Sequence, residues 1–220
     1  MPELELIGLP QSNFVWSCRI ACGEKGVPYR LTPARPHTPE IDAIHPFGKM
    51  PAMRHGDMTL CESRAIIAYI DRAFPGPAVL PADVATAARV EQWASIAATN
   101  LDPVWLRRCF AAYIFPGTPD GSPDRAAIDA ALAIMKRQFP VMERAVAANG
   151  HLAGPEFSLA DIYFVPILFY MSKFPESAAL LRQSPSLTKY LERQLQRKSI
   201  AKRRPRHFRA SAEFARRGSA

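Results

Sequence analysis

Residues 45–70 read HPFGKMPAMRHGDMTLCESRAIIAYI, and this stretch decides the fold that we predict for the first third of the chain. It begins with a turn at residues 46–49. Pro51 follows, and because proline has no N–H to donate, it belongs at the start of a strand. Gly-Asp at 56–57 is a tight-turn signal between two short strand candidates. Glu-Ser then begins a helix over residues 62–70.

Two positions in this stretch could bind a ligand. If the Met50-Pro51 bond is cis, the chain turns sharply there and exposes the backbone N–H and C=O of Met50 to a peptide-like ligand. The cis form is the minority state of such bonds. The hydroxyl of Ser63 and the free N–H groups of its helix form an anion site. Ser63 also fits a simple helix cap, which the residues alone favour.

The segments around this stretch alternate between strand and helix patterns. A strand is expected at residues 3–7 and a helix at 14–25, closed by Gly26. A second strand follows at residues 27–31, and a short helix is compatible with residues 39–43. The resulting order, βαβαββα, resembles an α/β thioredoxin-like domain.

The remainder of the chain has helical patterns. Residues 74–84 read as a linker because their prolines end the preceding helix. One long helix or a kinked pair is expected over 85–113, interrupted near Pro103. A second long helix is expected over 126–148, with a kink or break at Pro140.

Ser158 and Asp161 have the spacing of a capping box at the start of a buried helix, with Asp in place of the usual Glu. We therefore assign Asp161 a structural role. A last helix is expected over residues 185–197. These patterns predict an all-α second domain.

Composition narrows the class of protein. Of the 220 residues, 48% are hydrophobic, and no apolar run approaches the roughly 18 residues of a membrane span. No secretory signal pattern opens the sequence. The four cysteines form no CxxC pair and lack a matching histidine pair, so no metal site is expected. We predict a cytoplasmic protein with reduced thiols.

The formal net charge of +8 comes from one end of the chain. Residues 193–220 hold ten Lys or Arg and a single Glu, whereas the rest is close to neutral. We predict domains over residues 1–76 and 85–200, followed by a basic tail over 201–220. A solvated extension is favoured for the tail over contact with nucleic acid or an anionic surface.

The runs PFGKMPAM and CESRAIIAYI resemble the glutathione-binding half of the cytosolic glutathione S-transferases. They reproduce the family's turn, cis-Pro and Glu-Ser signature in order and spacing, and are most similar to the phi-like and related bacterial branches. The resemblance covers about residues 3–200. It implies a homodimeric transferase that conjugates glutathione, its co-substrate, to small hydrophobic electrophiles.

The resemblance also implies roles for residues that contact glutathione. The backbone of Met50, beside Pro51, would pair with the cysteinyl part of glutathione. Glu62 and Ser63 would hold the amine and carboxylate of the γ-glutamyl part.

The glycyl carboxylate of glutathione needs a cation or an amide group. Lys49 is the best candidate, because related proteins carry Gln or Lys there. His37 is a second candidate, near a basic position of the phi-like pattern, and it reads equally well as a solvated loop residue.

Catalysis in this family requires the thiolate of glutathione. A free thiol has a pKa near 8.5, and lowering it by ~2 units requires ~2.7 kcal/mol of thiolate stabilisation. A hydroxyl donor beside a helix N-terminus can supply this. Ser12 fits, because Pro10-Gln11-Ser12 resembles the family's first loop, although Asn13 replaces a common Pro. Ser12 is also a plausible helix cap.

Two other groups compete for this role. Ser17 would be the donor if the loop register differs. Cys18 would form a mixed disulfide with glutathione if it were an exposed thiolate. No tyrosine precedes Tyr29, which excludes a tyrosine-type mechanism in this loop.

The electrophile pocket should be apolar, and the family builds it between its domains. Its candidate residues here are Phe14, Trp105, Arg108, Phe110, Tyr113 and Phe115. Two alternative functions stay open. One is a different glutathione-dependent enzyme, such as a thiol reductase using Cys18, a peroxidase or an isomerase. The other is a non-catalytic scaffold that binds glutathione.

Overall fold

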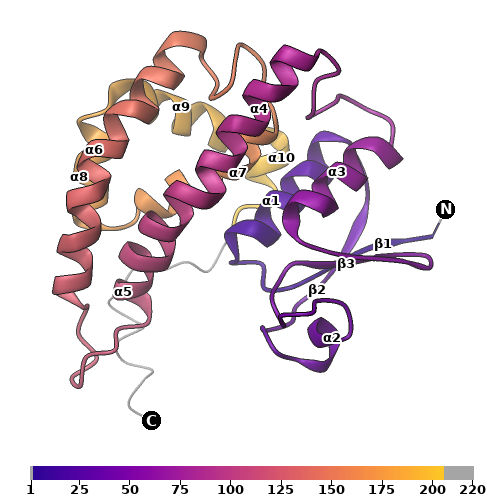
Figure 1. Ribbon diagram of the computed structural model, residues 1–220, viewed down its shortest axis with the longest axis horizontal. Coiled ribbons are helices and arrows are strands. Elements are labelled where there is room, and N and C mark those ends of the chain that lie inside the picture. The colour runs from indigo at the N-terminus through magenta and orange to yellow at the C-terminus, as the bar shows by residue number, and fades with distance from the viewer. Residues whose placement is uncertain (1, 206–220) are drawn as a thin grey trace. The chain divides into compact units, whose positions relative to one another are not determined.

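The computed structural model describes residues 2–205, which form two units (Figure 1). The first unit comprises residues 2–83 and 195–205 and contains the sheet, and the second comprises residues 84–194 and is helical. The predicted α/β and all-α halves are thus confirmed. The predicted second domain extends to residue 200, whereas the structure groups the chain from residue 195 with the first unit.

A four-stranded mixed sheet organises the first unit. Its strands are β1 (Leu4–Ile7), β2 (Tyr29–Thr32), β3 (Ala52–His55) and β4 (Met58–Cys61). Their order across the sheet is β2-β1-β3-β4. β1 is parallel to β2 and antiparallel to β3, and β3 is antiparallel to β4. This is the thioredoxin-like arrangement that the order of elements predicted.

Four helices complete the first unit. They are α1 (Asn13–Glu24), α2 (Pro39–Asp42), α3 (Ser63–Ala73) and α10 (Lys198–Ala201). α1 packs against both α3 and α10. Helix α10 overlaps the basic tail that was predicted over residues 201–220 only at Ala201. Residues 206–220 of that tail lie outside the described residues.

The register of the sheet gathers several loops at one edge. Ile7 pairs with Thr32 on one side and with Ala52 on the other, and Ala52 pairs with Cys61. These four residues form one row across the sheet. The segments that follow β1, β2 and β4 therefore meet at this edge, together with the segment that precedes β3. A small apolar cluster joins Ile7 and Ala52 to Ile41 of α2.

A buried ion pair anchors the linker to the first unit. Nζ of Lys25 lies 3.3 Å from Oδ1 of Asp71, and both side chains are almost fully buried. Lys25 also donates to the carbonyl of Gly76 at 3.1 Å. Asp71 accepts hydrogen bonds from the amides of Val79 and Leu80 at 2.9 and 3.2 Å. These contacts fix the start of the linker against the end of α1.

The second unit is a bundle around one buried helix, α7 (Leu159–Met171), in which every residue is buried. Helices that are apolar on all sides belong in a core. The other helices are α4 (Val84–Ile96), η1 (Ala97–Phe110), α5 (Ala111–Ile114), α6 (Arg125–Asn149), α8 (Pro175–Arg182) and α9 (Pro185–Gln196). α7 packs against α4 and η1, and η1 packs against α6.

The expected interruption at Pro103 does not occur. Residues 97–110 instead form a π-helix, η1, that continues α4. A π-helix pairs residues five apart, and the carboxylate of the buried Asp102 is held by Arg107 at 2.9 and 3.3 Å, five residues along. Similarly, α6 continues through Pro140 without a break.

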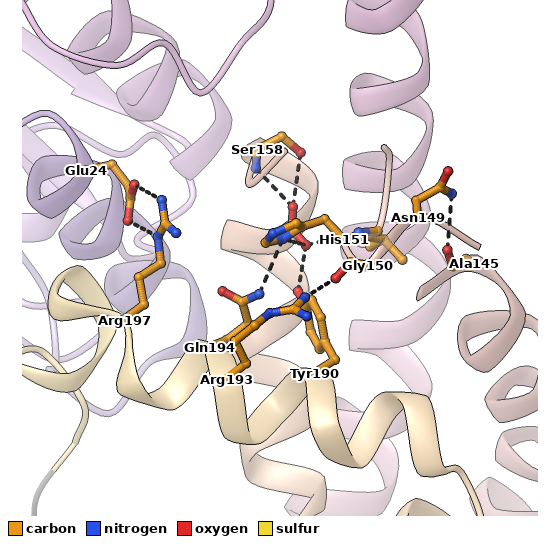
Figure 2. A network of polar contacts seen from close by, with 12 residues as sticks. Glu24, Ala145, Asn149, Gly150, His151, Ser158, Tyr190, Arg193, Gln194 and Arg197 are labelled. Atoms are coloured by element: carbon orange, nitrogen blue, oxygen red, sulfur yellow. Dashed lines mark hydrogen bonds and ion pairs between the residues drawn. The ribbon is translucent and has the colours of Figure 1, made fainter. Parts of the chain in front are cut away.

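The capping box of α7 is confirmed. The side chain of Ser158 caps the Asp161 amide, and the Asp161 carboxylate accepts from the Ser158 amide at 3.0 Å. The hydroxyl of Tyr190 donates to the same carboxylate at 2.7 Å, and His151 lies nearby (Figure 2). Asp161 is therefore structural, as predicted. Within residues 2–205, no helix combines the length and apolar character needed to cross a bilayer.

Candidate active site

The sheet edge at Ile7, Ala52 and Cys61 brings the predicted glutathione-binding segments of the first unit together. α1 begins after the loop that leaves β1, and α3 begins directly after β4. Two helix N-termini therefore start from the same edge. Each has the positive end of a helix dipole, which favours negatively charged ligand groups.

Ser12 is the N-cap of α1. Its backbone is extended, and its Oγ accepts a hydrogen bond from the amide of Val15 at 3.4 Å. The side chain is half-buried, and its hydroxyl proton is not used in this contact. A hydroxyl that accepts one hydrogen bond can still donate another. Ser12 is thus a helix cap whose hydroxyl proton remains available for a further hydrogen bond.

The two competing groups lie inside α1. Ser17 is fully buried and donates to the carbonyl of Asn13 at 3.0 Å. Cys18 is also fully buried, and its Sγ is 3.9 Å from the carbonyl oxygen of Ser63. Burial, with a smaller contribution from Cys22, raises the pKa of the Cys18 thiol well above its ordinary value. Neither residue therefore presents the exposed, reactive group that its alternative role requires.

Met50 lies against the loop that carries Ser12. The Met50-Pro51 peptide bond is cis, as the resemblance implied. The amide of Leu9 donates to Sδ of Met50 at 3.2 Å. A Cβ on Gly8 would lie 2.6 Å from a methyl group of Val15 and 3.0 Å from Cβ of Met50. Glycine is needed there because the two segments approach so closely.

Glu62 and Ser63 mark the start of α3. Ser63 is buried, and Glu62 precedes it with φ of 67°, a left-handed conformation that is uncommon for a residue other than glycine. Such conformations concentrate at ligand sites. The Glu62 side chain is 69% exposed, so its carboxylate is accessible to a ligand amine.

His45 is a site residue that the sequence patterns did not single out. It is buried, and its Nδ1 accepts from the amide of Phe47 at 3.1 Å. The ring proton is therefore on Nε2, which lies 3.5 Å from Oε1 of Glu62. His45 links the Pro-Phe-Gly turn to the glutamate. The sequence position of His45 could have indicated this role, because a side-chain acceptor two residues before Phe47 can close a turn.

The two candidates for the glycyl carboxylate lie close together. The amide of His37 donates to the carbonyl of Gly48 at 2.9 Å, and Lys49 is the next residue. A Cβ on Gly48 would lie within 2.1 Å of Nδ1 of His37. Both His37 and Lys49 are exposed, and Nδ1 of His37 is 3.8 Å from Oδ1 of Asp42.

The electrophile candidates have different environments within their own units. Phe14 is half-buried in the first turn of α1. Trp105 is fully buried in the helical core, stacks on Phe139 at 4.4 Å and donates to Oε1 of Gln138 at 2.6 Å. Packing explains Trp105 completely. Arg108 is exposed on η1.

Tyr113 is half-buried in α5, and its hydroxyl is already engaged. It donates to Glu176, which also pairs with Arg125 at 2.6 Å, and its ring stacks on Phe174 at 4.3 Å. Burial, followed by the Glu176 carboxylate, raises the pKa of Tyr113. Its ring, rather than its hydroxyl, is the part available to a ligand.

The architecture defines a class of protein: a thioredoxin-like unit joined to a helical unit. Comparisons with known proteins identify the family. Residues 6–78 match the N-terminal domain of glutathione S-transferases, and residues 106–198 match the C-terminal domain. A glutathione S-transferase 3 of Zea mays is 35% identical over 168 residues, which cover 73% of this chain and 75% of that protein. The chain belongs to the glutathione S-transferase family.

Solved structures agree with this assignment. The crystal structure of glutathione transferase F7 from Populus trichocarpa has a TM-score of 0.82 and 28% identity, covering 91% of this chain and 97% of that one. A maize glutathione S-transferase I in complex with an atrazine glutathione conjugate has a TM-score of 0.81 and 28% identity, covering 92% and 96%. The protein is a transferase, and glutathione is its co-substrate.

Proposed function

We propose that Ser12 activates glutathione by donating a hydrogen bond to its thiolate. The observation that carries this proposal is the position of Ser12 as N-cap of α1, with its oxygen bonded to the Val15 amide. Accepting that bond polarises the hydroxyl and makes it a better donor. The positive end of the α1 dipole adds positive potential at the same point.

In the reaction, the bound thiol loses its proton to solvent. The thiolate sulfur then attacks an electrophilic carbon, forming a carbon–sulfur bond. The electron pair of the broken bond leaves with a departing group or, in an addition, moves onto the neighbouring atom. Lowering the thiol pKa by ~2 units raises the thiolate fraction at neutral pH from a few per cent to most of the bound glutathione.

Glutathione itself is bound along the sheet edge. The main chain of Met50, next to Pro51, pairs with the cysteinyl part. Glu62 receives the γ-glutamyl amine, and Ser63, at the N-terminus of α3, receives its carboxylate. The left-handed conformation of Glu62 and the exposure of its carboxylate support this arrangement.

Two exposed basic side chains serve the glycyl end of glutathione. Lys49 supplies the principal charge, and His37 a second donor beside it. The hydrogen bond from His37 to Gly48, which precedes Lys49, supports their acting together. Neutral His37 can still donate one hydrogen bond to a carboxylate, so this contribution does not depend on protonation.

The second substrate is a small hydrophobic electrophile. The maize structure in complex with an atrazine glutathione conjugate supports a small organic electrophile as the second substrate of this chain too. Phe14, the ring of Tyr113 and the exposed Arg108 are its proposed contacts. Trp105 is not included, because its ring is fully buried in the helical core.

The proposed assembly is a homodimer with one glutathione site per subunit, as the family resemblance implies. The proposed location is the cytoplasm. The four cysteines are all unpaired, which fits a reducing compartment.

The ultraviolet absorbance of the bound thiolate, measured against pH, tests activation directly. Bound glutathione should show a pKa well below that of free glutathione. In Ser12→Ala this pKa should return towards the solution value, and turnover should fall by at least tenfold while glutathione affinity changes little. Ser17→Ala is the matched control and should keep both values.

Three results would contradict this proposal. Unchanged turnover in Ser12→Ala would remove Ser12 from the mechanism. Loss of activity in Cys18→Ser, but not in Ser12→Ala, would point to a thiol reductase that uses Cys18. If bound glutathione keeps the thiol pKa that it has in solution, the protein is better explained as a non-catalytic scaffold that binds glutathione.

A further inference from the structure

A cavity lies in the first unit, at the end of α1 remote from Ser12. Its volume is about 480 Å³. One wall is the end of α1 and the turn that follows it, and the other is formed by residues 197–203. The lining residues are Gly23, Glu24, Gly26, Val27, Pro28, Arg197, Lys198, Ser199, Lys202 and Arg203. Four cations and one carboxylate thus share one concave surface.

The carboxylate does not neutralise this surface. Glu24 forms a bidentate pair with Arg197, with both N–O distances at 2.7 Å (Figure 2). The hydroxyl of Ser199 also donates to Glu24. Because the Glu24 and Arg197 charges cancel, Lys198, Lys202 and Arg203 leave the cavity with a local charge of +3.

Arg203 contacts two neighbouring groups in the wall. Its Nη1 donates to the carbonyl of Ser199 at 3.3 Å, and its guanidinium lies 5.7 Å from the ring centroid of Tyr29. A Cβ on Gly23 would lie 2.6 Å from the same nitrogen, so glycine makes room for this side chain. Nε of Arg203 is buried and has no hydrogen-bond partner among the described residues.

The two lysines are not needed to hold α10 in place. Lys198 and Lys202 are exposed, and within residues 2–205 no acidic group pairs with either one. They lie four residues apart, which places them on the same face of one helical turn. With Arg203 they form a positive surface that Glu24–Arg197 fixes in position.

We propose that this cavity binds a small anion that carries two or three linked phosphoryl groups. Phosphoryl oxygens pair well with lysine and arginine, and several charges are needed to satisfy three cations at once. The volume falls within the roughly 300–1,000 Å³ of small-molecule sites. The apolar lining at Val27 and Pro28 can accommodate an attached organic group. A concave site of this size favours a small molecule over nucleic acid.

This site is separate from the proposed glutathione site. Ser12 lies at the N-terminus of α1 and Glu24 at its C-terminus, and a helix of 12 residues is about 18 Å long. Binding can therefore be measured with glutathione at saturation. Its outcome does not depend on the role proposed for Ser12.

Isothermal titration calorimetry of the full chain with inorganic pyrophosphate tests the proposal. Wild type should bind about one pyrophosphate per chain, with glutathione saturating and with weaker binding of inorganic phosphate. Lys198→Gln/Lys202→Gln should weaken binding about tenfold or more, because each cation in a partly enclosed site contributes appreciably. ATP should compete for the same site.

Lys136→Gln/Lys189→Gln is the matched control. It removes the same number of charges at two exposed lysines of the second unit, neither of which lines the cavity, and it should bind pyrophosphate as wild type does. An equal loss in both variants would overturn the proposal, because the protein surface would then attract anions unspecifically. So would no measurable binding of pyrophosphate. A short single-stranded DNA that binds where pyrophosphate does not would reject a small-molecule site as well.

Discussion

Replacing Asp161 by Ala should strongly destabilise the helical unit. The Asp161 side chain is fully buried and is the acceptor for several donors. The amides of Leu152 and Ser158 donate to it at 3.1 and 3.0 Å, and the hydroxyl of Tyr190 donates at 2.7 Å. Nδ1 of His151 lies 3.4 Å from the same carboxylate. Figure 2 shows how Ser158, His151 and Tyr190 converge on this point.

The size of the loss follows from the donors left without an acceptor. Each buried donor without a partner costs about 1–3 kcal/mol. Two of the three are main-chain amides that cannot turn away, whereas the Tyr190 hydroxyl can rotate. Losing the negative charge in the first turn of α7 adds about 0.5–1 kcal/mol. Allowing for relaxation, we expect Asp161→Ala to lower the free energy of unfolding by about 3–5 kcal/mol.

Urea denaturation followed by circular dichroism measures this loss. Tyr190→Phe is the matched comparison, because it removes one hydrogen bond at nearly constant volume and should cost about 1–2 kcal/mol. A loss below about 1.5 kcal/mol in Asp161→Ala, or one no larger than in Tyr190→Phe, would refute the reasoning. It would mean that water satisfies the amides of Leu152 and Ser158.

Three further results are expected. Asp71→Asn should lower the free energy of unfolding by about 3–5 kcal/mol, because it leaves the buried ammonium of Lys25 uncompensated. The double variant with Lys25→Met should recover most of this free energy in the same urea denaturation assay. The asparagine in His45→Asn can still close the turn, but its side chain should be too short to reach Glu62. In steady-state kinetics, KM for glutathione should therefore rise about 3–5-fold with kcat unchanged. An unchanged KM would remove His45 from the site. A thiol reagent at pH 8 should modify the half-exposed Cys61 at least tenfold faster than the other three cysteines, whose thiol pKa values burial raises; several fast thiols would contradict this.

The sequence patterns predicted the boundaries of helices and strands correctly where a local backbone rule and the final fold agree. Pro51 and Gly56 delimit β3, Gly26 follows the end of α1, and the Ser158–Asp161 pair begins α7. Each of these signals is a backbone requirement that the surrounding structure does not override. The resemblance added the cis bond at Pro51, which residue physics alone did not favour.

The patterns misled where the backbone leaves the usual helical or extended geometry. Pro103 reads as a break because proline lacks the N–H that an α-helix requires, and a period of 3.6 residues cannot reveal a π-helix. Two short helices, α8 and α10, were not predicted, since eight and four residues show little periodicity. The contact from His45 to Glu62 depends on how two loops close, which no local pattern encodes.

Much of the proposed glutathione site is made by backbone rather than by side chains. Two helix N-termini, the main chain of Met50 and the left-handed Glu62 all depend on the register of the sheet edge. The loop of Ser12 can lie against Met50 only because Gly8 has no side chain and adopts φ of 144°. A Cβ there would meet Met50 at 3.0 Å and separate the proposed hydroxyl donor from the proposed binding segment. The geometry of catalysis therefore rests on a residue that contributes no chemical group of its own.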